Sequence, residues 1–505
     1  MSKSLRCFFF LVLGNVLWMS GCGGGNTAPV TPVSPPSTYT VVAISDIHFN
    51  PLANPALFTS LNAQPASQWK SIFANDQATN PAPPATFGAD TNYPALELAL
   101  AALKQNLGSS PVVLFSGDML GHYLPWYFCE LYANPAATLT PPPSPACTLN
   151  STGTAAMQSF LDKTMAFVST EIRANVGNVP VIFVPGNIDT YDIAGTGPNA
   201  QFLSDNASTY YTQLLNSSID QASFQSTFTT LGSYSAPILN SKVLVIALDS
   251  NPFAQSPYLP PLNPYAELTW LDSQLSAAQA AGQTVWLMMH VPPGINTTGT
   301  AQNAAKKVAP NPGMDDEAAM MWQAQYQAEF MLILAKYPGL IAMGITGHTH
   351  MDEFRVLPTG DVLFGIPGIS PVFGNNPAFK IFTVAQASQM PMDYQTINYN
   401  LAASPAPAQY SSLYTFSTAY GATAGTTLAS SSQQLYPQLT LIAPATASFI
   451  NYYDAGNATS FPYPTGPGTF IQIPWNMANT ANWPLYSCGI SQMDESDYVD
   501  CVNSY

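Results

Sequence analysis

Basic side chains are scarce in this sequence. Lys and Arg together number 12 against 28 Asp and Glu, which gives a formal charge of −16. No Lys or Arg follows Lys380. A surface with this charge repels nucleic acid and anionic lipid, so we expect neither to be recruited by the folded polypeptide. Charged residues make up only 8% of the 505 residues and hydrophobic residues 47%, which argues against a disordered chain or a coiled coil.

Long apolar runs are equally rare, and the one that stands out lies at the N-terminus. Lys3 and Arg6 precede the run Cys7–Trp18, which has the length of a signal-peptide core and is too short to span a bilayer as a lone helix. Met19-Ser20-Gly21-Cys22 follows and resembles the lipobox of bacterial lipoproteins, which implies cleavage before Cys22 and acylation of its thiol. An ordinary secretory signal cleaved nearby is the alternative.

The N-terminal pattern therefore predicts an exported protein. We expect a signal peptide at residues 1–21 and a lipidated Gly-, Pro-, Ser- and Thr-rich tether at residues 22–38. The protein would then be anchored in the bacterial cell envelope or secreted, and it would meet a membrane only through its lipid.

Cysteines are few, which limits the chemistry they can support. Four of the six remain once Cys7 and Cys22 are set aside, and none has metal-site spacing with a nearby histidine. An even number of cysteines outside the cytosol favours disulfides. Local pairing gives Cys129–Cys147 and Cys488–Cys501.

Strand-like apolar runs alternate with helical patterns, which is typical of a layered α/β domain. The main predicted strands cover residues 39–45, 111–116, 179–184, 242–248, 284–289, 340–346, 361–367 and 379–383. Helical patterns cover residues 95–107, 154–176, 203–230, 265–281 and 315–336. Residues 50–92, rich in Pro, Ala and Asn, are expected to form a long irregular insertion. The composition changes near residue 401, so we expect a domain at 39–400 and a C-terminal subdomain at 401–505, with an acidic helix over 493–502.

Polar side chains follow most of these strands, and all five histidines of the chain are among them. An extended backbone would place His348 and His350 on one side, and likewise Asp46 and His48, while Gly347 allows a close approach of the backbone. The complete set is Asp46, His48, Asp118, His122, Asn187, His290, His348 and His350. Nitrogen and oxygen ligands without sulfur suit Zn, Mn or Fe better than Ca or Mg. Two metals about 3.5–4 Å apart and bridged by a carboxylate can hold a phosphate and activate a bridging water as hydroxide.

The order D-x-H, G-D, G-N, H, G-H-x-H resembles the calcineurin-like metallophosphoesterase superfamily, and over roughly residues 40–400 the chain looks like its acid sphingomyelinase and sphingomyelinase-like phosphodiesterase branch. The finer match lies in Gly117–His122, His290–Gly294, Gly347–Phe354, Asn375-Asn376-Pro377 and Met392–Thr396. The resemblance implies a four-layer α/β/β/α sandwich and two zinc ions. It implies one metal on Asp46, His48, Asp118 and His350, a second on Asp118, Asn187, His290 and His348, and His122 facing the substrate phosphate. The saposin domain of acid sphingomyelinase has no counterpart in the sequence, which leaves sphingomyelin in doubt as the substrate.

One position departs from the family pattern. The family reads G-N-H after the third strand, with the histidine a proposed proton donor, and this chain reads Gly186-Asn187-Ile188. We therefore predict a metal-dependent phosphodiesterase, acting on phosphodiesters or phosphoanhydrides of nucleotide or lipid-headgroup type, in which His122 is the sole general acid. A phosphomonoesterase or nucleotidase on the same scaffold is one alternative, and a weakly active phosphate-binding lipoprotein is the other.

Overall fold

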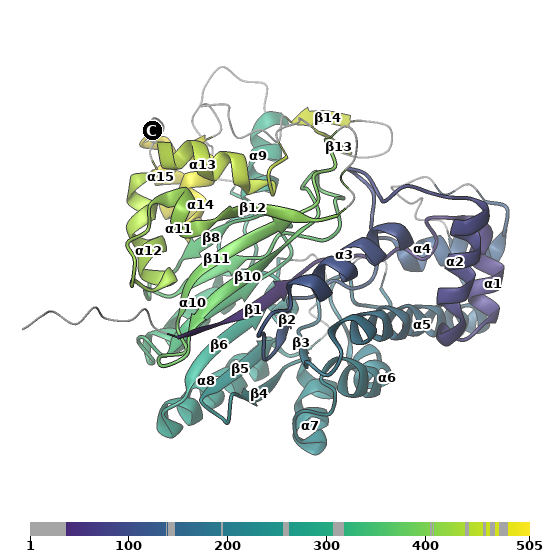
Figure 1. The fold of residues 1–505 in the computed structure, drawn as a ribbon, viewed down its shortest axis with the longest axis horizontal. Coiled ribbons are helices and arrows are strands. Elements are labelled where there is room, and N and C mark those ends of the chain that lie inside the picture. Colours follow the sequence, from purple (N-terminus) through teal and green to yellow (C-terminus); the bar gives the residue numbers. More distant parts are fainter. Residues whose placement is uncertain are drawn as a thin grey trace, which may run out of the picture. The chain divides into compact units, whose positions relative to one another are not determined.

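Two six-stranded sheets form the centre of the protein (Figure 1). The first sheet has the order β12-β11-β10-β1-β2-β3, and the second has the order β4-β5-β6-β7-β9-β8. The strands of the first sheet are β1 (Thr38–Ile44), β2 (Val113–Phe115), β3 (Val181–Phe183), β10 (Ala378–Ala385), β11 (Pro391–Asn398) and β12 (Ser411–Thr415). Those of the second are β4 (Tyr234–Ile238), β5 (Val243–Leu248), β6 (Thr284–Met289), β7 (Ile341–Thr346), β8 (Phe354–Val356) and β9 (Val362–Gly365). A separate two-stranded sheet pairs β13 (Phe461–Pro464) with β14 (Phe470–Ile473).

This computed structural model describes residues 37–137, 139, 147–192, 195–255, 262–306, 318–403, 407, 409–439, 444–457, 461–464, 470–473 and 483–505. The expected signal peptide, Cys22 and most of the tether lie outside these residues, and the description that follows concerns the unit Ser37–Tyr505. Among the described helices, none combines the length and the apolar composition that crossing a bilayer requires.

The side chains of the second sheet alternate between two cores. In β5, Val243, Val245 and Ala247 belong to a core shared with the first sheet, whereas Leu244, Ile246 and Leu248 pack in a second core. The second core also contains Leu271 and Leu275 of α8 and Phe330 of α10. Because successive side chains of a strand point to opposite faces, the sheet lies between the first sheet and these helices.

Helices cover the outer faces of the sheets. Their bounds are α1 (Phe58–Ala63), α2 (Trp69–Thr79), α3 (Tyr93–Asn106), α4 (Leu124–Ala133), α5 (Ser151–Val176), α6 (Ala200–Thr209), α7 (Gln221–Leu231), α8 (Pro264–Ala281), α9 (Thr297–Lys306), α10 (Ala324–Ala335), α11 (Phe416–Tyr420), α12 (Leu428–Leu435), α13 (Pro444–Tyr453), α14 (Trp483–Gly489) and α15 (Glu495–Asn503). The layered α/β architecture with two central sheets is as predicted.

The prediction of an irregular insertion at residues 50–92 is wrong. This segment contains α1 and α2, and the indole of Trp69 and the ring of Phe73 are buried against Phe160 and Phe167 of α5. The high content of Pro, Ala and Asn did not indicate helices here. The two short helices are stabilised by a few large aromatic side chains that pack against α5.

Both predicted disulfides are present. Cys129 of α4 is bonded to Cys147, and Cys488 of α14 is bonded to Cys501 of α15. The second bond joins two helices near the C-terminus, which include the acidic helix expected from the sequence. Strand β12, also C-terminal to residue 400, pairs with β11 and extends the first sheet.

Candidate metal centre

The loops after β1, β2 and β3 of the first sheet and after β6 and β7 of the second bring the predicted ligands together. Parallel pairing of β1 with β2, of β2 with β3, and of β6 with β7 places the carboxyl ends of these strands at one edge of each sheet. Asp118 is at the centre. Its Oδ2 lies 3.0 Å from Nε2 of His290 and 3.4 Å from Nε2 of His48.

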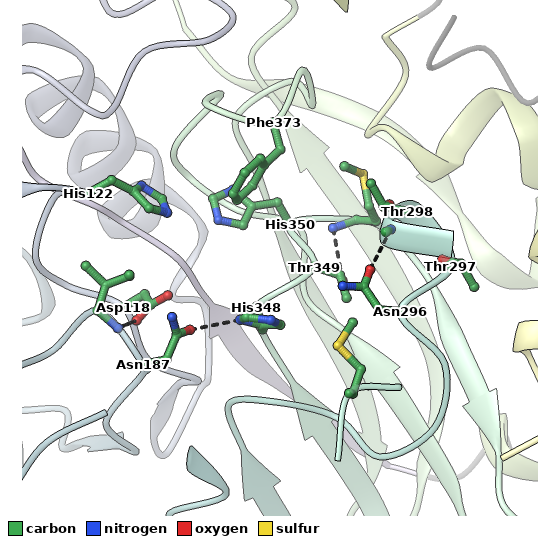
Figure 2. A pocket seen from close by; sticks show the side chains of 14 residues that line it. Asp118, His122, Asn187, Asn296, Thr297, Thr298, His348, Thr349, His350 and Phe373 are labelled. Atoms are coloured by element: carbon green, nitrogen blue, oxygen red, sulfur yellow. Dashed lines mark hydrogen bonds between the residues drawn. The ribbon is translucent and has the colours of Figure 1, made fainter. Parts of the chain in front are cut away.

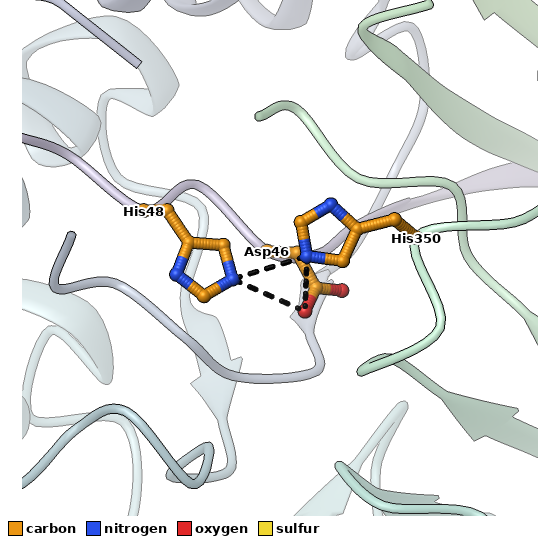
Figure 3. A group of neighbouring side chains, drawn as sticks. All are labelled: Asp46, His48 and His350. Atoms are coloured by element: carbon orange, nitrogen blue, oxygen red, sulfur yellow. Dashed lines mark hydrogen bonds and ion pairs between the residues drawn. The ribbon is translucent and has the colours of Figure 1, made fainter. Parts of the chain in front are cut away.

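Asp46, His48 and His350 form one cluster (Figure 3). The two Nε2 atoms of His48 and His350 are 3.1 Å apart, and Oδ1 of Asp46 lies 3.7 Å from the former and 3.4 Å from the latter. All three side chains are buried. Three ligand atoms that converge in this way on one buried point fit a metal ion.

Asp118, His290 and His348 form the second cluster. Asn187 joins it, because its Oδ1 lies 3.0 Å from Nε2 of His290 and 2.9 Å from Nδ1 of His348. Asp118 belongs to this cluster and also lies against His48 of the first. The structure therefore brings together all seven side chains that were predicted to bind metal.

Backbone carbonyls orient three of the imidazoles. The Nδ1 atoms of His48, His290 and His350 lie 3.0, 2.7 and 3.1 Å from the carbonyl oxygens of Leu120, Ser116 and Ser370, respectively. Each Nδ1–H donates to its carbonyl, so each Nε2 faces the centre. This arrangement fixes the tautomer and the orientation that a metal-binding histidine requires.

The electrostatics of the centre also fit cations. Burial lowers the pKa of His348 to about 4 and that of His350 to about 3, so both imidazoles are neutral, which is the form that binds a metal ion. Burial has the same tendency at His48 and His290, but there the nearby carboxylates of Asp118 and Asp46, acting together with other hydrogen-bonded and charged neighbours, outweigh it and raise each pKa to about 9. Buried carboxylates thus hold positive charge in the centre, and metal ions would supply that charge in place of the protons.

The backbone of the ligand loops differs from the predicted extended conformation. Asp46, His48, Asp118, His348 and His350 all have positive φ, between 43° and 70°. The side chains of His348 and His350 therefore reach different clusters instead of lying side by side. The close approach expected at Gly347 is present, since a Cβ there would lie 2.9 Å from Oδ2 of Asp46.

His122 lies beside the first cluster, and Asp90 holds it. The ring of His122 stacks on that of His48 with 4.0 Å between centroids. Its Nδ1 lies 2.8 Å from Oδ1 of Asp90, and its backbone N–H donates to Oδ2 of Asp90 at 2.6 Å. Sequence reasoning missed Asp90, because it lies in the supposed insertion and no local pattern links it to a histidine 32 positions later.

Ile188 and Asp189 have separate roles. Ile188 lines the cavity of the centre. Asp189 is fully buried, and its carboxylate accepts hydrogen bonds from the backbone N–H groups of Asp118, Met119, Leu120 and Gly186 at 2.8–3.1 Å. Burial raises the pKa of Asp189 to about 6. Asp189 therefore joins the loops after β2 and β3, and it is not among the residues that line the cavity.

A cavity of ≈ 260 Å³ opens onto the two clusters. In Figure 2, Asp118, Asn187, His348, His350 and His122 lie toward one side, and Asn296, Thr297 and Thr298 lie toward the other, at the start of α9. Its lining residues are Asp118, His122, Asn187, Ile188, Asn296, Thr297, Thr298, Gly299, Met321, His348, Thr349, His350, Met351 and Phe373. A small ligand in this cavity would therefore contact the proposed ligand atoms and the first turn of α9 together.

Comparisons with known proteins point in the same direction as the geometry. The chain is 24% identical over 321 residues to the sphingomyelinase phosphodiesterase D of Dictyostelium discoideum, covering 60% of this chain and 59% of that protein. It is 27% identical over 256 residues to sphingomyelinase phosphodiesterase C of the same organism, covering 46% and 51% of the two chains. The mouse acid sphingomyelinase-like phosphodiesterase 3b is 29% identical over 153 residues, which cover 28% of this chain and 30% of that protein. The chain thus spans less than two thirds of the length of these curated relatives.

Comparisons with solved structures and with family models give no further support for a specific function. The crystal structure of a dimetal phosphatase from Danio rerio is 12% identical and superposes with a TM-score of 0.36, covering 74% of this chain and 98% of that one. No family model matches the chain.

Proposed function

The chain is a distant homologue of the acid sphingomyelinase branch of the metallophosphoesterases, and from this premise we propose that it hydrolyses phosphodiester bonds at a centre of two divalent metal ions. The observation that carries the proposal is the position of Asp118, whose Oδ2 lies within 3.4 Å of imidazoles from both clusters. One carboxylate between two groups of buried nitrogen ligands is the arrangement that a bridged metal pair requires.

We assign the ligands as the family resemblance implies. Asp46, His48, Asp118 and His350 would hold one ion, and Asp118, Asn187, His290 and His348 would hold the other. Zinc suits these ligands best, with manganese or iron as alternatives. Bound there, the ions would stabilise the charge of the phosphoryl group and lower the pKa of an attacking water.

His122 is the proposed general acid. Asp90 accepts the Nδ1–H of His122 at 2.8 Å, which leaves Nε2 free to carry the proton for the leaving group. Among the cavity-lining residues, His122 is the one titratable side chain that we do not assign to a metal. Ile188 cannot share this role, because its side chain carries no proton that it could donate. The proposed substrates are therefore phosphodiesters or phosphoanhydrides whose leaving groups need only one proton donor.

Export and lipid anchoring through Cys22 complete the proposal. Two disulfides support an oxidising compartment outside the cytosol. A phosphomonoesterase or nucleotidase remains the second candidate, because the centre recognises the phosphoryl group in the same way for either substrate class.

The direct test is turnover of bis(p-nitrophenyl) phosphate by the purified protein before and after chelation, with zinc or manganese added back. We expect turnover that chelation abolishes and metal restores. A protein loaded with metal that does not hydrolyse this diester contradicts the proposal. Faster turnover of p-nitrophenyl phosphate than of the diester selects the phosphomonoesterase alternative.

The role of the His122–Asp90 pair has its own test. For diesters with alkoxide leaving groups, His122→Ala should lower kcat by about 10²–10⁴-fold with an unchanged metal content, since a general acid is lost and no metal ligand is removed. Asp90→Asn should lower kcat less, and its effect should grow as the leaving group becomes more basic. If Asp90→Asn lowers kcat equally for good and poor leaving groups, Asp90 has a structural role and does not assist proton donation by His122.

A further inference from the structure

The wall of the cavity that faces the proposed metal ligands is the first turn of α9. Thr297, Thr298 and Gly299 line the cavity there, and Asn296 caps the turn by accepting the N–H of Gly299 at 2.8 Å. Thr297 is only 5% exposed. Its position therefore depends on what packs behind it.

The C-terminal helical hairpin, α14 and α15, packs behind this wall. Gly489, the last residue of α14, lies so close to Thr297 that a Cβ built on the glycine would overlap Cγ2 of the threonine. The hydroxyl of Thr297 meets the hydroxyl of Tyr453, at the end of α13, at 3.2 Å. Thr297 is thus held between C-terminal residues and the cavity.

The same hairpin fixes the loop that runs from His290 to Thr297. Gln327 accepts the N–H of Gly294 at 2.6 Å and donates to the carbonyl oxygen of Met493 at 2.8 Å. Glu495 accepts the N–H of Ala318 at 3.1 Å. The Cys488–Cys501 bond, adjacent to Gly489, ties α14 to α15. The wall therefore cannot move away from the cavity without displacing the hairpin.

The residues of this wall indicate which kind of chemical group can bind against it. Its residues are the uncharged Thr297 and Thr298, and Met321 and Met351 line the cavity nearby. Among the cavity-lining residues, the only carboxylate is Asp118, on the side of the metal ligands, and none is Lys or Arg. An uncharged organic group beside the phosphate fits this wall better than a charged one.

We propose that Gly489 is a specificity-determining residue. The lack of a side chain there lets Thr297 withdraw from the cavity, so the C-terminal hairpin sets the size of the uncharged group that is accepted beside the phosphate. This inference rests on the proposed function only in that the centre must bind a phosphoryl group.

Binding of two phosphoryl probes tests it without any need for turnover. Inorganic phosphate and phenylphosphonate are titrated by calorimetry into the zinc-loaded full chain and into Gly489→Ala. The added methyl pushes Thr297 toward the cavity, so phenylphosphonate should bind about tenfold more weakly, which is a change of about 1.4 kcal/mol. Phosphate affinity and zinc content should stay within about twofold, because the smaller probe does not reach the wall.

Further variants keep the test decisive. In the double variant Gly489→Ala/Thr297→Ser the overlapping methyl is removed from the other side, and phenylphosphonate affinity should recover. Thr297→Ser alone removes a methyl group from the wall and should raise the affinity for phenylphosphonate relative to that for phosphate. This variant provides the test if Gly489→Ala does not fold. Ser496→Ala, at an exposed position of α15, is the matched control.

The outcomes separate this inference from the proposed function. An unchanged preference in Gly489→Ala, an equal loss of both probes, or a wild type that does not bind phenylphosphonate overturns the role of Gly489. A wild type that shows the expected binding pattern but hydrolyses no diester contradicts the proposed function and leaves the role of Gly489 in place.

Discussion

Five of the seven proposed metal ligands adopt the left-handed backbone conformation, which costs a residue other than glycine about 1–3 kcal/mol. The residues are Asp46, His48, Asp118, His348 and His350. Hydrogen bonds between the loops hold these conformations; for example, the N–H of Asp46 donates to the carbonyl of Gly117 at 2.9 Å, and that of His48 to the carbonyl of Asp118 at 3.0 Å. Such strain is expected where a site must direct several side chains from short loops to one point.

At the same scale, Ile188 offers the clearest gain-of-function test. Ile188→His places an imidazole at a half-buried position that lines the cavity. We expect kcat to rise by about tenfold or more for diesters with alkoxide leaving groups, within the range that a second general acid supplies. Aryl diesters should gain little, because phenolates leave without full protonation. No gain for any leaving group would show that proton donation does not limit the proposed reaction.

Asp249, just after β5, predicts an unusual dependence of stability on pH. Burial raises its pKa to about 7, and its Oδ2 has no hydrogen-bond partner among the described residues. The folded state therefore binds more protons than the unfolded state, so the free energy of unfolding falls as the pH rises from about 4 to about 7. In Asp249→Asn, the decrease in the free energy of unfolding over this pH range should be smaller than in the wild type by up to about 4 kcal/mol.

Urea unfolding of the chelated protein at pH 5 and pH 8 measures this difference. Asp500→Asn, at an exposed position of α15, is the control and should leave it unchanged. If Asp249→Asn loses as much stability as the wild type between the two pH values, the pH dependence does not come from the Asp249 carboxyl.

At the scale of elements, the segments that sequence patterns described least well contribute directly to the site. The supposed insertion supplies Asp90, and the C-terminal hairpin backs the cavity wall through Gly489. Buried charges connect the C-terminal strand β12 to the ligand loop as well. Asp352, two residues after His350, pairs with Lys380 at 2.7 Å and accepts the hydroxyl of Tyr414 in β12 at 2.9 Å.

Loss of the Cys488–Cys501 bond should destabilise the protein. The double variant Cys488→Ser/Cys501→Ser opens a loop of 13 residues, for which chain entropy predicts a loss of about 3 kcal/mol. Thermal unfolding monitored by circular dichroism measures the change. A double variant as stable as the wild type would show that the packing of α14 and α15 suffices to hold the hairpin.

At the scale of the whole molecule, the centre joins the two sheets. Asp46, Asp118 and Asn187 follow strands of the first sheet, and His290, His348 and His350 follow strands of the second. A metal ion bound at either cluster therefore links loops from both sheets. Binding energy at the centre becomes stability of the whole fold, since the unfolded chain has no such site.

Zinc should accordingly stabilise the protein against unfolding. At a free concentration about 100 times its Kd, each bound zinc ion should raise the free energy of unfolding by about 2.7 kcal/mol. The zinc affinity should increase with pH toward about 9, because metal binding must displace protons from His48 and His290, whose pKa values are raised to about 9. Denaturant titrations with zinc and with chelator measure both effects. Equal stability with and without zinc would contradict a metal centre, and Asp118→Asn should weaken the effect.

The sequence by itself determined the α/β class, most of the strands, both disulfides and the eight polar side chains after the strands that the structure brings together at the centre. These features are local or carry a chemical signature: apolar runs, paired cysteines, and histidines and carboxylates at strand ends. Only the tertiary structure decided which imidazoles face each other, that Asp90 holds His122, and that Gly489 lies behind the cavity wall. Each of these depends on contacts between residues far apart in the chain, where packing geometry acts and no short sequence pattern records it.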